Sequence, residues 1–193
     1  MEPVRAFIAI ELPIQIKAAL AQLQDNLRTG KSVSVRWVDP EGIHLTIKFL
    51  GNVDETEIPP LTKALSEAVR GVAPFSLQLG DPGAFPNAFA PRVVWVGVEG
   101  EIEPLRTLHN NIDCVLTPLG FPPEKRAFSP HLTLGRVRDE ASPNEKRRLG
   151  ENVAKLKTGE KTTFIVGSIS LMRSLLTREG AVYSRLASFE LCG

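Results

Sequence analysis

Along the chain, segments in which apolar residues recur about every two residues alternate with segments in which they recur about every 3.6 residues. Short alternating or continuous apolar runs predict strands at residues 4–12, 33–38, 44–50, 75–81, 92–98, 131–137, 162–173 and 181–191. Apolar residues at helical spacing predict helices at residues 13–30, 54–71, 101–116 and 143–156. Because strands and helices alternate without a glycine-rich phosphate loop, we expect an α+β fold of mainly antiparallel sheets with helices on their outer side.

Parts of this pattern recur at a fixed distance, which indicates a duplication. His131 follows His44 by 87 residues, and both open the same pattern of histidine, leucine, threonine and an apolar residue. At the same offset, residues 4–12 match 91–99, and residues 75–81 match 162–168. A repeat of this length is too long for a solenoid unit. The alternative is that two unrelated strands begin alike by chance.

The duplication predicts one domain, residues 1–193, made of two pseudo-symmetric lobes at about 1–82 and 91–193 around a central cleft. The lobes are joined by residues 81–92, which combine three prolines, a glycine and two phenylalanines without periodicity and are predicted to be a loop. Phe85 and Phe89 in this loop are interpreted either as anchors to the core or as exposed aromatic side chains with a role of their own.

The two repeated strands each place a histidine beside a threonine. In an extended strand, residues i and i+2 share a face. His44 and Thr46 therefore point to one side of their strand, and the apolar residues between and after them point to the other. His131 and Thr133 repeat this arrangement in the second strand. One site between the lobes can thus receive two imidazoles and two hydroxyls.

Composition narrows the class of protein. The 193 residues carry a net charge of +1, with 42% hydrophobic and 23% charged residues, as in ordinary soluble domains. This charge gives no global field for a long nucleic acid, but it allows an RNA end or a short oligonucleotide in a local basic pocket. No run reaches membrane-spanning length, and the N-terminus lacks the features of a signal peptide. With no metal-ligand spacing at Cys114 and Cys192, we expect reduced cysteines in a cytoplasmic monomer without membrane association.

Paired histidines suggest three chemistries. Two imidazoles are too few ligands for a metal, and the sequence shows no spaced carboxylate or cysteine to complete a set, so no metal or other cofactor is expected. Catalysis by a serine or cysteine nucleophile would leave the repeated threonine without a role. Acid–base catalysis uses all four residues, because one imidazole can remove a proton while the other donates one. The threonine hydroxyls can then donate hydrogen bonds to a phosphoryl oxygen, which favours an anionic phosphodiester as substrate.

These motifs resemble the paired HxTx motifs of the 2H phosphoesterase superfamily. More narrowly, the chain resembles the bacterial and archaeal RNA 2′,3′-cyclic phosphodiesterases, also called 2′-5′ RNA ligases. One HxTx pattern is short and weakly specific, but two within matching flanks are specific. The likeness runs nearly end to end through residues 5–13, 37–51, 91–98, 128–136 and 183–191.

The resemblance implies metal-free hydrolysis of a 2′,3′-cyclic phosphate at an RNA 3′ end, leaving a 2′-phosphate. It also implies that His44 protonates the departing 3′ oxygen and that His131 activates water. From the residues alone the lobes are too alike to assign these roles, although Thr46 and Thr133 are expected to bind phosphate oxygens. Arg126, in the loop before the second motif, is the first further candidate for substrate binding, and Lys125 and Arg136 are weaker ones.

Several alternatives stay open at this level. Arg126 is otherwise an ordinary charged loop residue, and His109 is expected to be a surface histidine of the third helix. Phe49 alternates away from His44 in a regular strand, so stacking on a base would require a twist or bulge. The main activity is either hydrolysis or the joining and cleavage of 2′-5′ linkages. A protein that holds terminal phosphates without turning them over is the alternative from another class.

Overall fold

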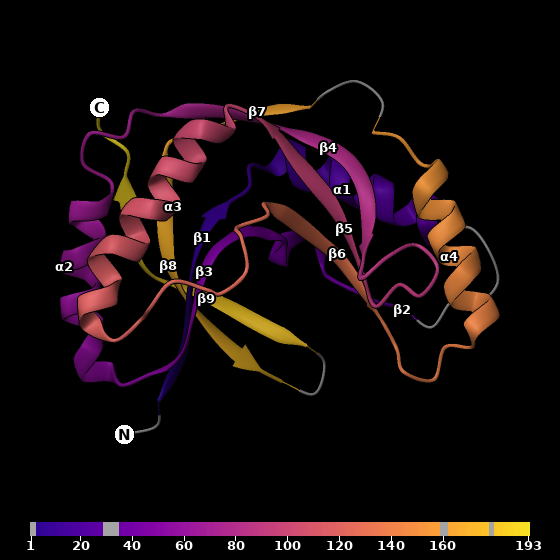
Figure 1. The fold of residues 1–193 in the computed structure, drawn as a ribbon, viewed down its shortest axis with the longest axis horizontal. Helices are drawn as coiled ribbons and strands as arrows, with labels where there is room; N and C mark the ends of the chain where they lie inside the picture. The colour runs from indigo at the N-terminus through magenta and orange to yellow at the C-terminus, as the bar shows by residue number, and fades with distance from the viewer. Residues whose placement is uncertain (1–2, 29–34, 159–161, 178–179) are drawn as a thin grey trace.

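The structure, a computed structural model, describes residues 3–28, 35–158, 162–177 and 180–193. Its strands form two antiparallel sheets (Figure 1). Sheet A contains, in spatial order, β3 (His44–Val53), β1 (Val4–Glu11), β8 (Ser168–Leu176) and β9 (Ala181–Glu190). Sheet B contains β2 (Val35–Trp37), β6 (His131–Val137), β5 (Val93–Gly100), β4 (Phe75–Phe85) and β7 (Thr163–Val166). The predicted α+β class is confirmed.

Each sheet is covered by helices on one face. The helices are α1 (Ile14–Arg28), α2 (Ile58–Ala68), α3 (Ile102–Leu116) and α4 (Pro143–Lys155). Helix α1 follows β1 of sheet A but lies against sheet B, where the Gln24 amide donates hydrogen bonds to the carbonyls of Val38 and Leu134 at 2.7 and 2.9 Å. Helices α2 and α3 pack together beside sheet A (Figure 1). Helix α1 therefore follows a strand of sheet A and packs on sheet B, whereas α3 follows a strand of sheet B and packs beside sheet A.

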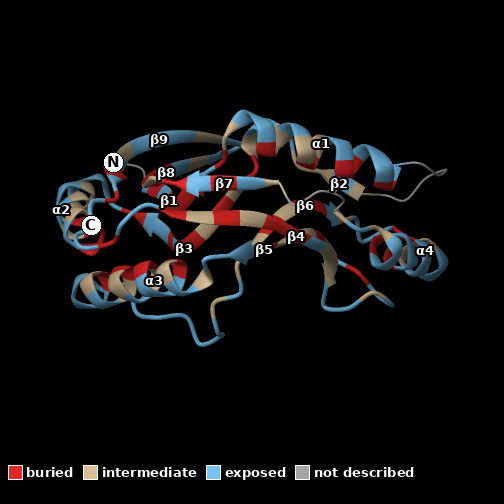
Figure 2. Ribbon diagram, turned by 90° about the horizontal axis from the view of Figure 1, so that it is seen from above, coloured by how far each residue is buried: buried red, intermediate tan, exposed pale blue. Residues whose placement is uncertain are grey.

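The apolar periods of the sequence account for this packing. Ile8 and Ile10 of β1, like Val94 and Val96 of β5, are almost fully buried on the side of their strand that faces the helices. Most of the buried residues of both lobes form one hydrophobic cluster, and in Figure 2 the buried segments lie between the sheets and the helices. Phe7, Ala9 and Met172 form a small second cluster, against which Tyr183 packs. Burial of a side chain of this size stabilises the fold by about 1.5–3 kcal/mol. The apolar residues therefore determine which side of each strand faces the helices, and the opposite side carries the motif residues.

The two sheets are related by the duplication, but the lobes exchange strands. The spatial order β3–β1–β8–β9 corresponds to β6–β5–β4–β7, and β3 and β6 carry the repeated histidines. Strand β4 of the first half belongs to sheet B, whereas β8 and β9 of the second half belong to sheet A. Each half of the chain therefore contributes strands to both sheets.

Two predicted element boundaries are wrong. The loop expected from residue 81 begins later, since β4 continues to Phe85. Pro82 is tolerated there because it follows an irregularity in the pairing of β4 with β5, where a missing N–H is least harmful. The strand expected over residues 162–173 is divided at Gly167, where the chain leaves sheet B as β7 and enters sheet A as β8.

Some expectations fall on residues that the structure does not describe. The start of the strand predicted at residues 33–38 and the glycine expected to end the first helix lie outside the described ranges. So does the middle of the turn at 177–180, although its ends are joined by a hydrogen bond from the Thr177 N–H to the Gly180 carbonyl. Cys114 and Cys192 are free cysteines.

His109 differs from the predicted surface histidine. Only 15% of its side chain is exposed, its ring stacks on Phe128 with centroids 4.3 Å apart, and its Nε2 lies 3.9 Å from Asp113. Asp113 in turn accepts from the Lys48 ammonium at 2.5 Å, and this ammonium also donates to the carbonyl of Pro122 at 2.8 Å. The buried Lys48 thus joins β3, α3 and the segment that leads to the second motif.

Candidate active site

A bulge in β3 decides which residues share a face with His44. Across the antiparallel ladder, Glu11 lies opposite His44, Ala9 opposite Thr46 and Phe7 opposite Phe49. The residues of β1 alternate regularly, so these three partners share one face, and the same holds for His44, Thr46 and Phe49. The pairing skips one residue between Thr46 and Lys48, which turns Phe49 toward the motif face. The bulge required for Phe49 to lie beside His44 is therefore present.

The same irregularity occurs in β6. Gly97, Trp95 and Val93 of β5 lie opposite His131, Thr133 and Arg136, respectively, and the pairing shifts after Val94. Because alternate residues of β5 share a face, Arg136 lies on the same face as His131 and Thr133. Arg136 thus occupies the position in sheet B that Phe49 occupies in sheet A.

His44 is held in a partly buried aromatic setting. Its Nδ1 lies 2.8 Å from the carbonyl oxygen of Gly42. Its ring stacks on Phe7 at 4.6 Å and meets the edge of Tyr183 at 4.9 Å. Burial lowers the pKa of His44 below 6.5, while the hydrogen bond to Gly42 and the charge of Glu11 act in the opposite direction.

His131 is held in a similar way. Its Nδ1 lies 2.7 Å from the carbonyl oxygen of Ser129, again two residues before the histidine. Phe85 meets the ring edge-on at 5.1 Å, and Trp95 lies 6.3 Å away. Phe85 is 36% exposed and contacts the rings of Trp95 and His131, so it lies at the motif and not in the core, and Phe89 is 82% exposed.

The backbone fixes the tautomer of both histidines. A carbonyl oxygen only accepts hydrogen bonds, so Nδ1 carries a proton in each ring. Nε2 is then the nitrogen free to accept a proton when the ring is neutral, or to donate one when it is charged. β3 and β6 contact each other between the lobes (Figure 1), so the two motif strands are neighbours. Within the described residues, no side chain or backbone group engages the hydroxyls of Thr46 and Thr133.

Glu11 distinguishes the two otherwise similar halves. The Arg185 guanidinium binds both of its carboxylate oxygens at 2.7 and 2.9 Å, and the Ser170 hydroxyl donates to it at 2.5 Å. These hydrogen bonds lower the pKa of Glu11, so it is a carboxylate at neutral pH. The residue opposite His131 is Gly97, which has no side chain. Of the two motif histidines, His44 alone therefore has an acidic residue directly across the ladder.

Two of the predicted substrate-binding residues lie in the segment between α3 and the second motif. Lys125 and Arg126 are exposed there, and within the described ranges no hydrogen bond or ion pair joins either of them to a motif residue. Three further residues beside His44 carry no motif in the sequence: Glu11, Phe7 and Tyr183. The sequence does contain a sign of Glu11. It ends the first predicted strand, and the matching strand of the second half also ends in an acid, Glu99, one residue beyond the position that corresponds to Glu11.

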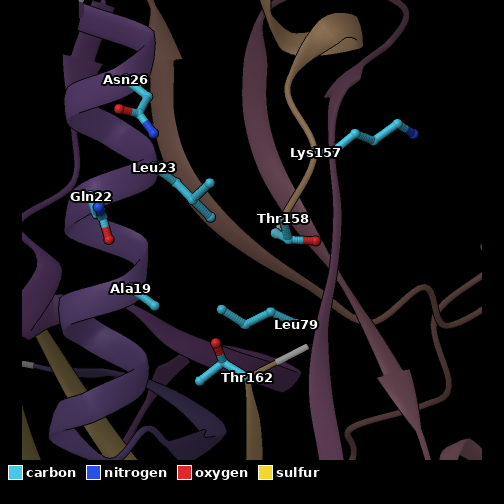
Figure 3. Close-up of a pocket in the computed structure, with 8 residues that line it drawn as sticks. All are labelled: Ala19, Gln22, Leu23, Asn26, Leu79, Lys157, Thr158 and Thr162. Carbon is cyan, nitrogen blue, oxygen red and sulfur yellow. The ribbon is translucent and has the colours of Figure 1, made fainter. Parts of the chain in front are cut away.

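One pocket lies away from the motifs. It has a volume of about 290 Å³ and lies between α1, the middle of β4 at Leu79, and Lys157, Thr158 and Thr162 (Figure 3). Leu23 and Leu79 line it from the helix-covered side of sheet B, opposite the motif face. None of the predicted site residues lines this pocket. In the described ranges, no group of three His, Cys, Asp or Glu side chains is placed to hold a metal, and no helix is long and apolar enough to span a membrane.

Comparison with known proteins agrees with the duplicated motifs. The family model described as LigT like phosphoesterase matches the chain twice, at residues 10–95 and 96–183. The RNA 2′,3′-cyclic phosphodiesterase of Methanothermobacter thermautotrophicus is 35% identical over 188 residues, covering 97% of this chain and 99% of the relative. The protein of the same name from Aeropyrum pernix is 35% identical, covering 86% of this chain and 92% of the relative.

Solved structures share the fold over the whole chain. A protein of Thermus thermophilus superimposes with a TM-score of 0.78 at 30% identity, over 97% of both chains. E. coli LigT in complex with 3′-AMP superimposes with a TM-score of 0.79 at 26% identity, over 100% of both chains. Two family matches, full-length relatives and these structures together place the chain in the LigT-like phosphoesterase family of the 2H phosphoesterases.

Proposed function

We propose that this protein hydrolyses 2′,3′-cyclic phosphodiester ends of RNA to 2′-phosphomonoesters by metal-independent acid–base catalysis. The observation that carries the proposal is the pair of histidines on neighbouring strands, each with Nδ1 bound to a backbone carbonyl and with Nε2 left for proton transfer. The names of the curated relatives support the substrate, since they are RNA 2′,3′-cyclic phosphodiesterases.

In the proposed reaction, Nε2 of His131 removes a proton from water as the water oxygen bonds to phosphorus. The bond between phosphorus and the 3′ oxygen breaks, and His44 donates a proton from Nε2 to that oxygen. Thr46 and Thr133 donate hydrogen bonds to the phosphoryl oxygens as negative charge develops. Phe49, exposed on the motif face, offers a flat surface to the terminal base.

Glu11 supports the assignment of His44 as the acid. A carboxylate across the ladder stabilises an imidazolium, and His131 has no such neighbour. In the free protein, burial lowers the pKa of His44 and so favours the neutral ring. An anionic phosphodiester beside the ring would raise its pKa again, so substrate binding would charge the acid where it is needed.

The function is tested with purified protein and a 2′,3′-cyclic mononucleotide after dialysis against EDTA. We expect full turnover and a single product, the 2′-monophosphate, identified by ³¹P NMR. Activity that vanished on chelation and returned with Zn²⁺ or Mn²⁺ would replace the two-histidine mechanism with a metal-activated water. Joining of RNA ends without hydrolysis would identify ligation as the main activity.

The pH dependence provides a separate prediction. Because one ring must be neutral and the other charged, kcat/KM should rise and then fall between about pH 5 and 9, with two apparent pKa values that belong to the pair. Glu11 raises the pKa of His44, so Glu11→Gln should lower one of these two values and leave the other in place. His44→Ala should abolish one limb of the bell, and His131→Ala the other.

Glu151→Gln is the matched control, because it removes the same charge from α4, where Glu151 faces Arg147. This variant should keep the wild-type profile. A wild-type profile that is flat over the whole range, with chemistry rate-limiting, would rule out acid–base catalysis by histidine.

A further inference from the structure

Two arginines lie directly opposite each other where β2 meets β6. Arg36 is the ladder partner of Arg136. Directly opposed residues of an antiparallel pair have Cβ atoms about 4.5–5.5 Å apart, and like charges at such positions destabilise the sheet. Both side chains are exposed, and no carboxylate within the described ranges pairs with either of them. Two cations that no described carboxylate pairs with are thus placed side by side, although like charges at such positions disfavour the sheet.

The pair lies on the catalytic side of sheet B. Arg136 shares a face with His131 and Thr133, and Arg36 shares that face because it is directly opposite Arg136. Trp37, the next residue of β2, points to the helix-covered side, where Arg28 lies 5.5 Å over its ring. Because alternate residues of β2 point to opposite faces, Arg36 lies on the motif side of the sheet, and Trp37 with Arg28 of α1 lies on the helix side.

Arg36 also reaches toward the other lobe. A Cβ placed on Gly180, at the end of the β8–β9 hairpin of sheet A, would lie 3.7 Å from its Nη2. The guanidinium of Arg36 therefore lies near the end of this hairpin. An extended strand advances about 3.3 Å per residue, which puts the arginine pair roughly 13–16 Å along β6 from His131. This is too far for Arg36 to share the phosphate beside which His131 acts.

Guanidinium groups bind phosphates through a planar pair of N–H donors. An anion between two opposed arginines converts their repulsion into two attractive contacts. Resting on the proposed function, we infer that Arg36, together with Arg136, binds a second phosphate of the RNA, the phosphodiester that precedes the cyclic end. The site would make the protein prefer RNA ends to free cyclic mononucleotides.

The test compares two substrates, of which only the second carries this phosphodiester: 2′,3′-cyclic AMP and the dinucleotide ApA with a 2′,3′-cyclic end. Loss of one charged hydrogen-bonding group should lower kcat/KM of Arg36→Gln for the dinucleotide by roughly 10- to 100-fold. The mononucleotide should be turned over at the wild-type rate. Arg36→Lys should lie between wild type and Arg36→Gln, because it keeps the charge but loses the planar fork.

Arg28→Gln is the matched control, since it removes an arginine from the helix side of β2. It should affect both substrates equally. A salt series adds a second readout: the slope of log kcat/KM against log salt for the dinucleotide should become shallower by about 0.7 in Arg36→Gln.

Equal effects of Arg36→Gln on both substrates, or no effect on either, would overturn the inference. Failure of wild type to turn over either substrate would instead refute the proposed function. In that case, equilibrium titration with ApA bearing a 2′-phosphate and with 2′-AMP still decides the arginine site. Wild type should bind the dinucleotide more tightly than Arg36→Gln does, and both should bind 2′-AMP alike.

Discussion

Alanine in place of His44 or His131 should lower kcat/KM for a 2′,3′-cyclic nucleotide by about two to four orders of magnitude. Each imidazole presents one Nε2 to the reaction, because its Nδ1 is bound to the backbone, so each variant loses one complete proton transfer. The double variant should be little slower than the slower single one, because the two groups act in one step. Steady-state kinetics of the three variants measures this directly.

His109→Ala is the control for these variants, since it removes the remaining histidine without touching either motif. Its kcat/KM should match wild type, although loss of the stack on Phe128 should lower its thermal unfolding temperature. Wild-type activity in either motif variant, with the fold intact by circular dichroism, would contradict the paired mechanism.

Lys48→Ala should destabilise the protein by about 3–5 kcal/mol. The Lys48 side chain is 2% exposed, and its removal leaves the carboxylate of Asp113, 13% exposed, without its close cation. The carbonyl of Pro122 also loses its donor. Urea unfolding followed by fluorescence measures the free energy. Lys17→Met is the matched control, because the partner of Lys17 is the exposed Glu41, and it should cost less than about 1 kcal/mol.

A double variant separates the charge from the packing. Lys48→Met with Asp113→Leu removes both charges and fills the same space, so it should recover most of the lost free energy. If the double variant were no more stable than Lys48→Ala, the loss would come from packing around β3 and not from an unpaired charge.

Much of the architecture follows from local pattern. The four helices and the two motif strands were predictable because their apolar periods match the faces that are buried, as Leu45 and Leu132 illustrate. The family could be identified from the two motifs and their flanks. Each helix, each strand and each motif is a pattern of residues that lie close together in the sequence.

The exchange of strands was not predictable in this way. Residues 162–173 read as one strand, and only the positions of the two sheets in space require the chain to change sheets at Gly167. The placement of Phe49 and Arg136 depends on bulges, which leave no mark in an alternating pattern. Lys48 shows the same limit, since a charged residue in a strand gives no sign that its partner lies on a helix 65 residues later.

The strand exchange also has a consequence for how the protein is made. Sheet A needs β8, which is translated long after β1, because β8 pairs with one edge of β1. Synthesis at about 5–20 residues per second therefore leaves the hydrogen-bonding edge of β1 open for several seconds after the first motif has emerged. Sheet A is therefore incomplete until β8 and β9 have been translated, and in that interval the open edge of β1 is a site at which another copy of the chain can pair.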